Sequence, residues 1–215
     1  MEVESMGGFL EVMKGRRSVR RYLPDRVPME ILYGVLESAG WAPSAHNAQP
    51  WRFIAIIDDD LKKRLAEAMA EEWIKDLTAD GLSPGEARAK AEASIALFTG
   101  SPVLILACLS MEDMDKYPDK RRMEIEYIMA VQSLAAAIQN MLLTIHHMGL
   151  GGCWFCAPLF CKEAVRGILG IPGDVEPQAL VTLGYPCEEP KPPPRKPIQK
   201  FSYLNRWGEE FRSPY

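Results

Sequence analysis

The chain has 215 residues, of which 47% are hydrophobic and 25% are charged, and its formal net charge is −4. These values are ordinary for a globular protein with a sizeable core, and the acidic balance argues against general binding of nucleic acid or a membrane surface. Residues 1–8 show no apolar signal segment and the apolar runs fall short of a membrane span, so a cytoplasmic protein is expected.

Helical patterns dominate the first half of the chain and surround one predicted strand. The compact apolar run 51–59 predicts that strand, which should be buried. Four helices are expected around it: a short one ending near Gly15, one that follows Pro28 and ends at Gly40, one over 59–78, and one that Ser83 caps before Pro84. Together the last two define a helical insert at about 69–98.

The second half of the chain predicts two more strands and one long helix. Residues 102–109 are apolar on both faces, as in a central strand, and residues 178–185 predict a third strand. Residues 122–148 form the longest helix candidate and are apolar nearly all round. A helix of that kind is buried on every side, which in a chain of this size suggests burial partly against a second subunit.

The C-terminal segment is expected to be an extended arm over about 186–215. It begins with a proline-dense stretch that cannot pack as an independent element, so this stretch either extends into solvent or wraps a partner. A segment that carries many large apolar side chains is expected to dock. Five such side chains follow the proline-dense stretch: Phe201, Tyr203, Leu204, Trp207 and Phe211. The uneven order of helices and strands predicts an α+β fold with a mixed sheet flanked by helices. No glycine-rich dinucleotide motif or P-loop occurs.

A basic run at residues 16–21, "RRSVRR", stands out in this acidic chain. It gathers four guanidinium groups and one hydroxyl within six residues. Such a run is usually a solvated basic face, but planar guanidinium groups are also the donors that favour phosphate. The run therefore predicts either a solvated face or an anion site for one phosphate.

Two further segments carry polar or sulfur-containing residues, "APSAHNAQPWRF" at 42–53 and "GLGGCWFCAPLF" at 149–160. Alone, the first is an ordinary turn, and His46 in it is more often a surface residue than an acid or base. The pair Cys153 and Cys156 has no thioredoxin-like context and no well-spaced fourth ligand, although Cys161 and Cys187 are candidates. Packing cysteines are favoured, and no metal is expected.

Taken together, the three segments resemble the nitroreductase family of flavin enzymes. The late segment 183–197 also looks like the C-terminal pattern of that family. The resemblance implies one nitroreductase-like domain over 1–215 and an intertwined homodimer with the flavin at its interface. It implies FMN as cofactor, NADH or NADPH as electron donor and a small-molecule acceptor. The flavin carries the chemistry in such enzymes, so no catalytic side chain is expected.

The same resemblance assigns roles to individual residues. The terminal phosphate of FMN would be held by Arg16, Arg17 and Ser18, and Arg20 would reach the pyrimidine edge of the ring. Arg195 would add a late cation to the phosphate, although a solvated tail charge is an equal alternative. The second wall of the site would be formed by Pro43, Ser44 and Asn47, with Gln49 as a neighbour.

A third wall would offer a backbone N–H to flavin N5. The positions that match are Cys156, Ala157, Pro158 and Leu159. Proline has no N–H, so the donor is expected to be Ala157 or Leu159.

Within the family, the chain looks most similar to the reductase domain of coenzyme F-420 biosynthesis enzymes. The similarity lies in residues 69–94 and 149–160. One alternative function is therefore the reduction of a deazaflavin precursor. Another alternative is a flavin-binding protein that does not turn over. The insert is read equally well as a lid over the acceptor site or as a peripheral helical hairpin.

Overall fold

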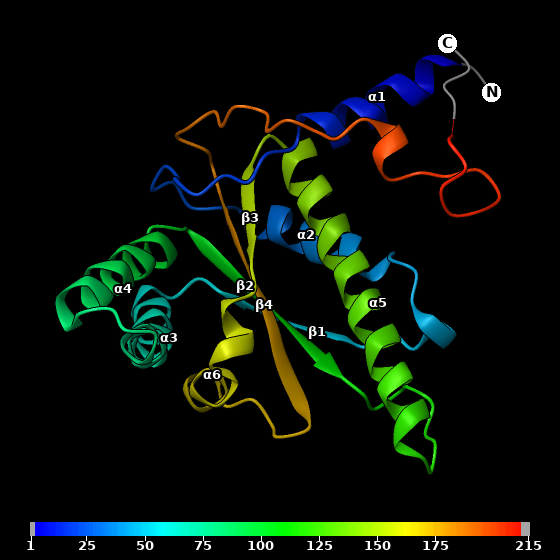
Figure 1. The fold of residues 1–215 in the computed structure, drawn as a ribbon. Helices are drawn as coiled ribbons and strands as arrows, with labels where there is room; N and C mark the ends of the chain where they lie inside the picture. The colour runs from blue at the N-terminus through cyan, green and yellow to red at the C-terminus, as the bar shows by residue number, and fades with distance from the viewer. Residues whose placement is uncertain (1–2, 212–215) are drawn as a thin grey trace.

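The computed structural model describes residues 3–211, and a four-stranded sheet lies at its centre (Figure 1). The strands are β1 (Trp51–Ile56), β2 (Val103–Ser110), β3 (Gly151–Phe155) and β4 (Val175–Gly184). Their order is β1-β2-β4-β3, and every neighbouring pair is antiparallel. A single parallel bridge joins Ser18 to Gly152 at the β3 edge, and there the sheet becomes mixed. The predicted α+β architecture is confirmed.

Helices cover both faces of this sheet. One face carries α2 (Met29–Gly40) and α5 (Lys120–His147), and the other carries α3 (Asp59–Ala79), α4 (Pro84–Thr99) and α6 (Lys162–Leu169). Side chains of β2 alternate between the two cores, with Ile105 in the first and Leu106 in the second. All of β2 is buried, as expected of a central strand, and α1 (Val3–Gly15) lies at one end of the molecule (Figure 1).

Local signals in the sequence located most of these elements. Ser83 caps α4 as predicted, in a capping box in which its hydroxyl accepts from the Glu86 N–H and the Glu86 carboxylate accepts from the Ser83 N–H. Strand β3 and helix α6 were not predicted. Gly151 and Gly152 suggest the end of a helix, yet they belong to a strand. A Cβ at Gly151 would lie 2.7 Å from Val19 side-chain atoms, so glycine lets the N-terminal segment pass close to this strand.

Helix α5 corrects two expectations. By length and composition it is long and apolar enough to cross a membrane, so the apolar runs do not all fall short of a membrane span. Here it packs along the sheet and α2, with residues such as Leu134 and Ile138 fully buried. It is not buried on every side within one chain, however, because Ile125 and Ile128 are exposed, Ile128 by 54%.

The C-terminal arm is largely irregular in structure. It crosses the end of the molecule where α1 lies (Figure 1) and carries a short 3-10 turn, η3 (Ile198–Lys200). Its large apolar side chains do not dock on this chain, since Phe201 is 63% and Trp207 is 89% exposed. Tyr203 and Trp207 pack on each other instead, with ring centroids 4.6 Å apart. A proline-dense chain forms no helix or ladder that could fold these side chains back onto its own core.

A half-buried polar junction ties β4 to α5 and α6. Glu176 Oε1 accepts hydrogen bonds from Tyr127 Oη at 2.7 Å, from Lys162 Nζ at 2.6 Å and from Gln178 Nε2 at 2.5 Å. Burial alone would raise the pKa of Glu176. The hydrogen bonds from Lys162 and Tyr127, together with the charges of Lys162 and Arg166, outweigh burial and hold this pKa below its usual value.

Glu176→Gln should lower the free energy of unfolding at pH 7 by about 1.5–3 kcal/mol, because three hydrogen bonds lose their ionised acceptor. The folded-state pKa lies below the unfolded one, so the wild-type benefit is present above about pH 4.5 and is lost as pH falls through the folded pKa. Urea unfolding at pH 7 and pH 4 checks this, since the variant should lose less stability between them than the wild type. Glu163→Gln, which alters an exposed pair with Arg166, is the control and should cost under about 1 kcal/mol.

Candidate functional site

The basic run begins where α1 ends and lines a cavity of about 350 Å³. Arg16 and Arg17 lie on one side of this cavity, and the segments Gly149–Gly152 and Pro186–Pro190 lie on the others. The end of α1 packs tightly against the end of α5, because a Cβ at Gly15 would come within 2.7 Å of His146 Nε2. The structure thus places these arginines around a concavity, not on an open helix face.

The guanidinium groups at the start and middle of this run are not ion-paired to carboxylates of the described residues. Within residues 3–211, none of Arg16, Arg17 and Arg20 forms an ion pair with a carboxylate. Burial lowers the pKa of His146, and the charges of Arg16 and Arg17 lower it further, so the positive field reaches the cavity wall. Two acidic residues, Glu188 and Glu189, also line the cavity, and Glu188 Oε1 accepts a hydrogen bond from the Arg20 backbone N–H at 2.8 Å.

The middle of the run lies along β3 and so meets the third predicted segment. The bridge from Ser18 to Gly152 places Arg20 beside β3, where its guanidinium lies 6.0 Å from the ring centroid of Phe155. Burial raises the pKa of the neighbouring Cys153 thiol, and the charge of Arg20 only partly counters this. The first and third segments are therefore brought together by the sheet edge.

Strand β3 runs into the 3-10 turn η2 (Ala157–Phe160), where the four candidate loop residues lie. Cys156 is exposed and caps the turn, and Pro158 is buried. The Leu159 N–H already donates to the Cys156 carbonyl at 3.1 Å. Of the two expected donors, only the Ala157 N–H has no hydrogen-bond partner in the part of the chain that the structure describes.

Three of the cysteines are packing residues. Cys108, Cys153 and Cys161 are buried, and burial raises the pKa of the Cys161 thiol to about 11, with a smaller contribution from Glu72 and Asp76. Such thiols stay protonated at neutral pH, which disfavours thiolate chemistry there. Cys156 and Cys187 are exposed.

The second predicted segment lies elsewhere in this chain. It forms the turn η1 (Ala45–Asn47), which the Ala45 N–H fixes to Ser133 Oγ of α5 at 3.1 Å. Ser133 and His146, which lies beside Arg16, are separated by about 20 Å along the α5 axis at 1.5 Å per residue. Candidate residues Pro43, Ser44, Asn47 and Gln49 are therefore not brought to the basic run within one chain. Arg195 is exposed on the arm and does not line the cavity either.

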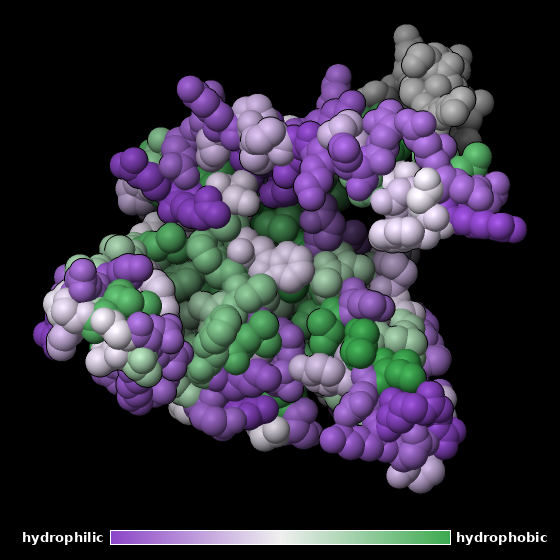
Figure 2. Space-filling view, in the orientation of Figure 1, coloured by the Kyte–Doolittle hydropathy of each residue, from purple (hydrophilic) through white to green (hydrophobic). Residues whose placement is uncertain are grey.

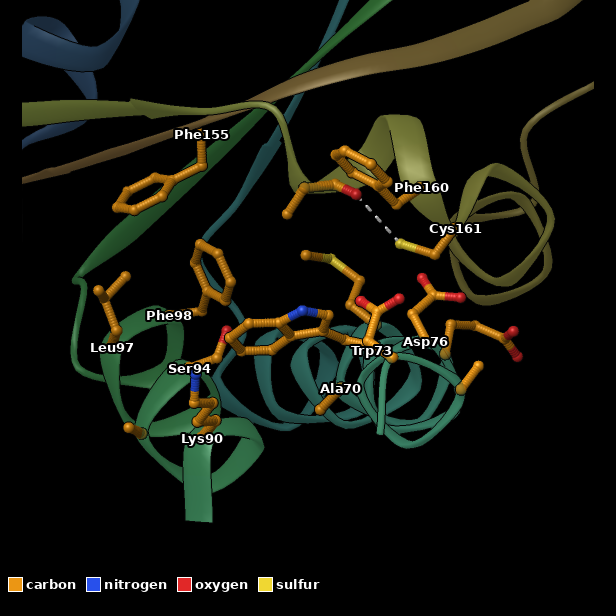
Figure 3. Close-up of a pocket in the computed structure, with 16 residues that line it drawn as sticks. Ala70, Trp73, Asp76, Lys90, Ser94, Leu97, Phe98, Phe155, Phe160 and Cys161 are labelled. Carbon is orange, nitrogen blue, oxygen red and sulfur yellow. Dashed lines mark hydrogen bonds between the residues drawn. The ribbon is translucent and has the colours of Figure 1, made fainter. Parts of the chain in front are cut away.

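A larger cavity of about 910 Å³ was not predicted from the sequence. It opens between the α3–α4 hairpin and the β3–η2 segment, and apolar atoms gather in the recess between α4 and α5 in Figure 2. Its aromatic lining comes from all of these elements: Trp73, Phe98, Phe155 and Phe160 (Figure 3). A signal was present, because Trp73 interrupts the charged stretch "EEWIKD" of α3 and is still 40% exposed.

Strand β3 links the two cavities, because Gly152 lines the smaller one and Phe155 the larger one. Phe155 lines the larger cavity, where its ring meets Phe98 edge to face at 5.2 Å, and it also lies beneath Arg20. Ala157, with its free N–H, lines the larger cavity as well. The site is therefore a continuous edge that runs from a positive concavity, past β3, into an aromatic pocket.

Comparisons with known proteins identify the family of the chain. The model of the nitroreductase family matches residues 13–185. A protein of Methanothermobacter thermautotrophicus that carries the name NADH dehydrogenase/NAD(P)H nitroreductase is 31% identical over 183 residues, which are 84% of this chain and 78% of that protein. The NADH dehydrogenase of Thermus thermophilus is 31% identical over 209 residues, 86% of this chain and 90% of that protein. A solved BluB-like flavoprotein from Clostridium difficile 630 is 25% identical with a TM-score of 0.75, and the match covers 96% of this chain and all of that one. The chain belongs to the nitroreductase family.

Proposed function

We propose that this protein is an FMN-dependent oxidoreductase that takes electrons from NADH or NADPH and passes them to a small organic acceptor. Its family supports this, as do a relative named NADH dehydrogenase and a structural neighbour named a flavoprotein. The observation that carries the proposal is that Arg16 and Arg17 line a concavity without an ion-pair partner among residues 3–211, with Arg20 close by beside β3. Bound FMN would supply the redox chemistry, accepting a hydride equivalent from the nicotinamide and reducing the acceptor.

The donor set fits the phosphate end of such a cofactor. Arg16 and Arg17 offer planar guanidinium groups to the smaller cavity. Ser18 does not line this cavity in one chain, and its side chain faces the Cys153 thiol. None of the three arginines of the site is committed to a carboxylate within residues 3–211, so their charge is free to bind an anion. In an acidic chain this is the arrangement that a phosphate requires.

The isoalloxazine ring of the flavin would be contacted by two groups along β3. The Arg20 guanidinium lies where a cation would stabilise the negative charge that a reduced flavin gains at its pyrimidine edge. The free Ala157 N–H is the donor that could reach flavin N5. Both act by position and charge, so no side chain has to serve as nucleophile or base.

A homodimer would complete the site. Pro43, Ser44, Asn47 and Gln49 lie too far from the basic run in one chain, so a partner subunit would supply them. The exposed Ile125 and Ile128 of α5 and the uncovered aromatic side chains of the arm support a large apolar interface. We place residues 1–215 in one cytoplasmic domain, with the insert at about 69–98 and the arm at about 186–215.

The aromatic cavity is the place for the acceptor. Its volume of about 910 Å³ suits a planar organic molecule, and it adjoins Ala157 at the ring end of the flavin site. This supports the interpretation of the α3–α4 hairpin as a lid. A deazaflavin precursor is the second candidate acceptor, because residues 69–94, which carry that resemblance, form one wall of the cavity.

Trp73→Ala should raise KM for aromatic acceptors by about tenfold, since aromatic stacking contributes about 0.5–1.5 kcal/mol beyond area burial. The rate of flavin reduction by NADH should stay within a factor of about two, because Trp73 lies on the lid and not on the proposed phosphate clamp. Steady-state and stopped-flow kinetics separate the two effects. Trp41→Ala alters an exposed tryptophan outside this cavity and is the control.

The proposed function is tested on the freshly purified protein. Flavin absorption bands that bleach rapidly on mixing with NADH or NADPH, and return when an acceptor is added, are expected. A protein that binds FMN but shows no bleaching would be a flavin carrier without turnover. A colourless protein that gains no flavin bands on titration with FMN would contradict the proposal.

A further inference from the structure

A second cluster of charged side chains lies outside the cavities described so far. His46 Nε2 is 3.4 Å from Glu126 Oε1 and 4.0 Å from Asp115 Oδ2. One donor atom from each residue fits within 4.8 Å of the other two. The three residues come from separate elements: the turn η1, the loop after β2 and the first half of α5.

Glu126 is the unusual member because it is buried without enough partners. The residue is only 3% exposed, and its Oε2 has no hydrogen-bond partner among residues 3–211. Two nearby cations on α5 are engaged elsewhere, since Arg122 pairs with Asp119 and Lys120 pairs with Glu124, and among the described residues Arg121 forms no ion pair with Glu126. A buried carboxylate oxygen left unpaired is costly, so this atom points to a missing ligand.

The chemistry of the donors defines that ligand. One imidazole and two carboxylates suit a divalent transition-metal ion such as Mn²⁺ or Zn²⁺. Donors on such an ion lie about 3.0–3.5 Å apart when each bond is about 2.1 Å long. The His46–Glu126 separation already matches, and Asp115 needs a small inward movement, which its half-exposed side chain permits. Two carboxylates would neutralise a doubly charged ion.

We propose that His46, Asp115 and Glu126 bind one divalent transition-metal ion per chain, with solvent completing its coordination. The ion would fix the turn η1 to α5 and to the loop after β2. That turn holds His46 and Asn47 at φ values of 57° and 54°, with Gln49 close behind at 47°, a conformation that persists only where surrounding contacts enforce it. Metal occupancy would therefore set the position of Asn47 and Gln49.

The test is a titration of the chelator-treated holoprotein with Mn²⁺, followed by electron paramagnetic resonance, which counts the free ion. Thiols compete poorly for Mn²⁺, so the exposed Cys156 and Cys187 do not obscure the result. One bound ion per chain is expected, and Zn²⁺ should displace it. The variants His46→Gln, Asp115→Asn and Glu126→Gln each lose a direct ligand. Loss of an outer-shell partner weakens metal binding by about 10- to 100-fold, so each variant should weaken Mn²⁺ binding at least that much.

Two matched controls make the test specific. Asp113→Asn alters a neighbouring carboxylate that pairs with Arg52, and His147→Gln alters a histidine at the far end of α5. Both should bind Mn²⁺ as the wild type does. Absence of binding in the wild type, or unchanged binding in the exposed-site variants His46→Gln and Asp115→Asn, would overturn the proposal. Because binding is counted directly, the result does not depend on whether the flavin turns over.

Discussion

Arg16→Ala is expected to weaken FMN binding by about 1.5–3 kcal/mol, or about 10- to 150-fold in Kd. The reason is that Arg16 lines the smaller cavity, carries no carboxylate partner within residues 3–211, and would donate charge-assisted hydrogen bonds to the phosphate. The Kd of Arg16→Lys for FMN should lie between those of Arg16→Ala and the wild type, because lysine keeps the charge but lacks the planar guanidinium group. Fluorescence titration of the apoprotein with FMN measures all three constants.

The control for this prediction lies in the same basic run. Arg21 is exposed, and its backbone carbonyl, not its side chain, contacts Cys187. Arg21→Ala removes the same charge from the same segment but should change the Kd less than about threefold, the effect of a screened surface charge. Equal losses in Arg16→Ala and Arg21→Ala would indicate a diffuse basic face and contradict a defined phosphate site.

Heterodimers made from two defective chains are expected to regain flavin binding. One chain carries Arg16→Ala and Arg17→Ala, and the other carries Asn47→Ala and Gln49→Ala. If each site takes the basic run from one chain and the turn η1 from its partner, the heterodimer contains one intact site and one doubly defective site. It should bind one FMN with wild-type Kd, while both parent homodimers bind weakly.

The structural reason is the separation of about 20 Å along α5 between the neighbours of these two segments. Differently tagged chains allow the heterodimer to be purified, and FMN absorbance against protein concentration gives the stoichiometry. If both segments served the same site within one chain, each site in the heterodimer would carry one defect and no binding would return. That outcome would contradict a site shared between subunits.

The elements that followed from local signals were predicted well from the sequence. Helical periodicity and the Ser83 capping box are properties of a few neighbouring residues, so α2, α3 and α4 could be located. Strand β3 could not be predicted, because position 151 requires a glycine for its close approach to Val19, which is a tertiary contact. Where the aromatic side chains of the arm dock could not be predicted either, because this chain leaves Phe201 and Trp207 exposed.

The site, too, was predicted where it depends on local sequence and missed where it depends on tertiary packing. The resemblance predicted that the basic run and the 149–160 segment belong together, and the bridge from Ser18 to Gly152 accounts for their meeting. Neither the aromatic cavity nor the buried Glu126 was anticipated, because both depend on how distant helices pack. A tryptophan among charged residues was the only local hint of the cavity.

The central claim is that the concavity beside Arg16 and Arg17 binds the phosphate of a flavin. A comparison of FMN with riboflavin, which lacks the phosphate, tests it most directly in one titration series on the wild-type apoprotein and on Arg16→Ala. FMN should bind the wild type at least about tenfold more tightly than riboflavin, and the difference should shrink in the variant. Equal affinities of the wild type for the two flavins would contradict the account.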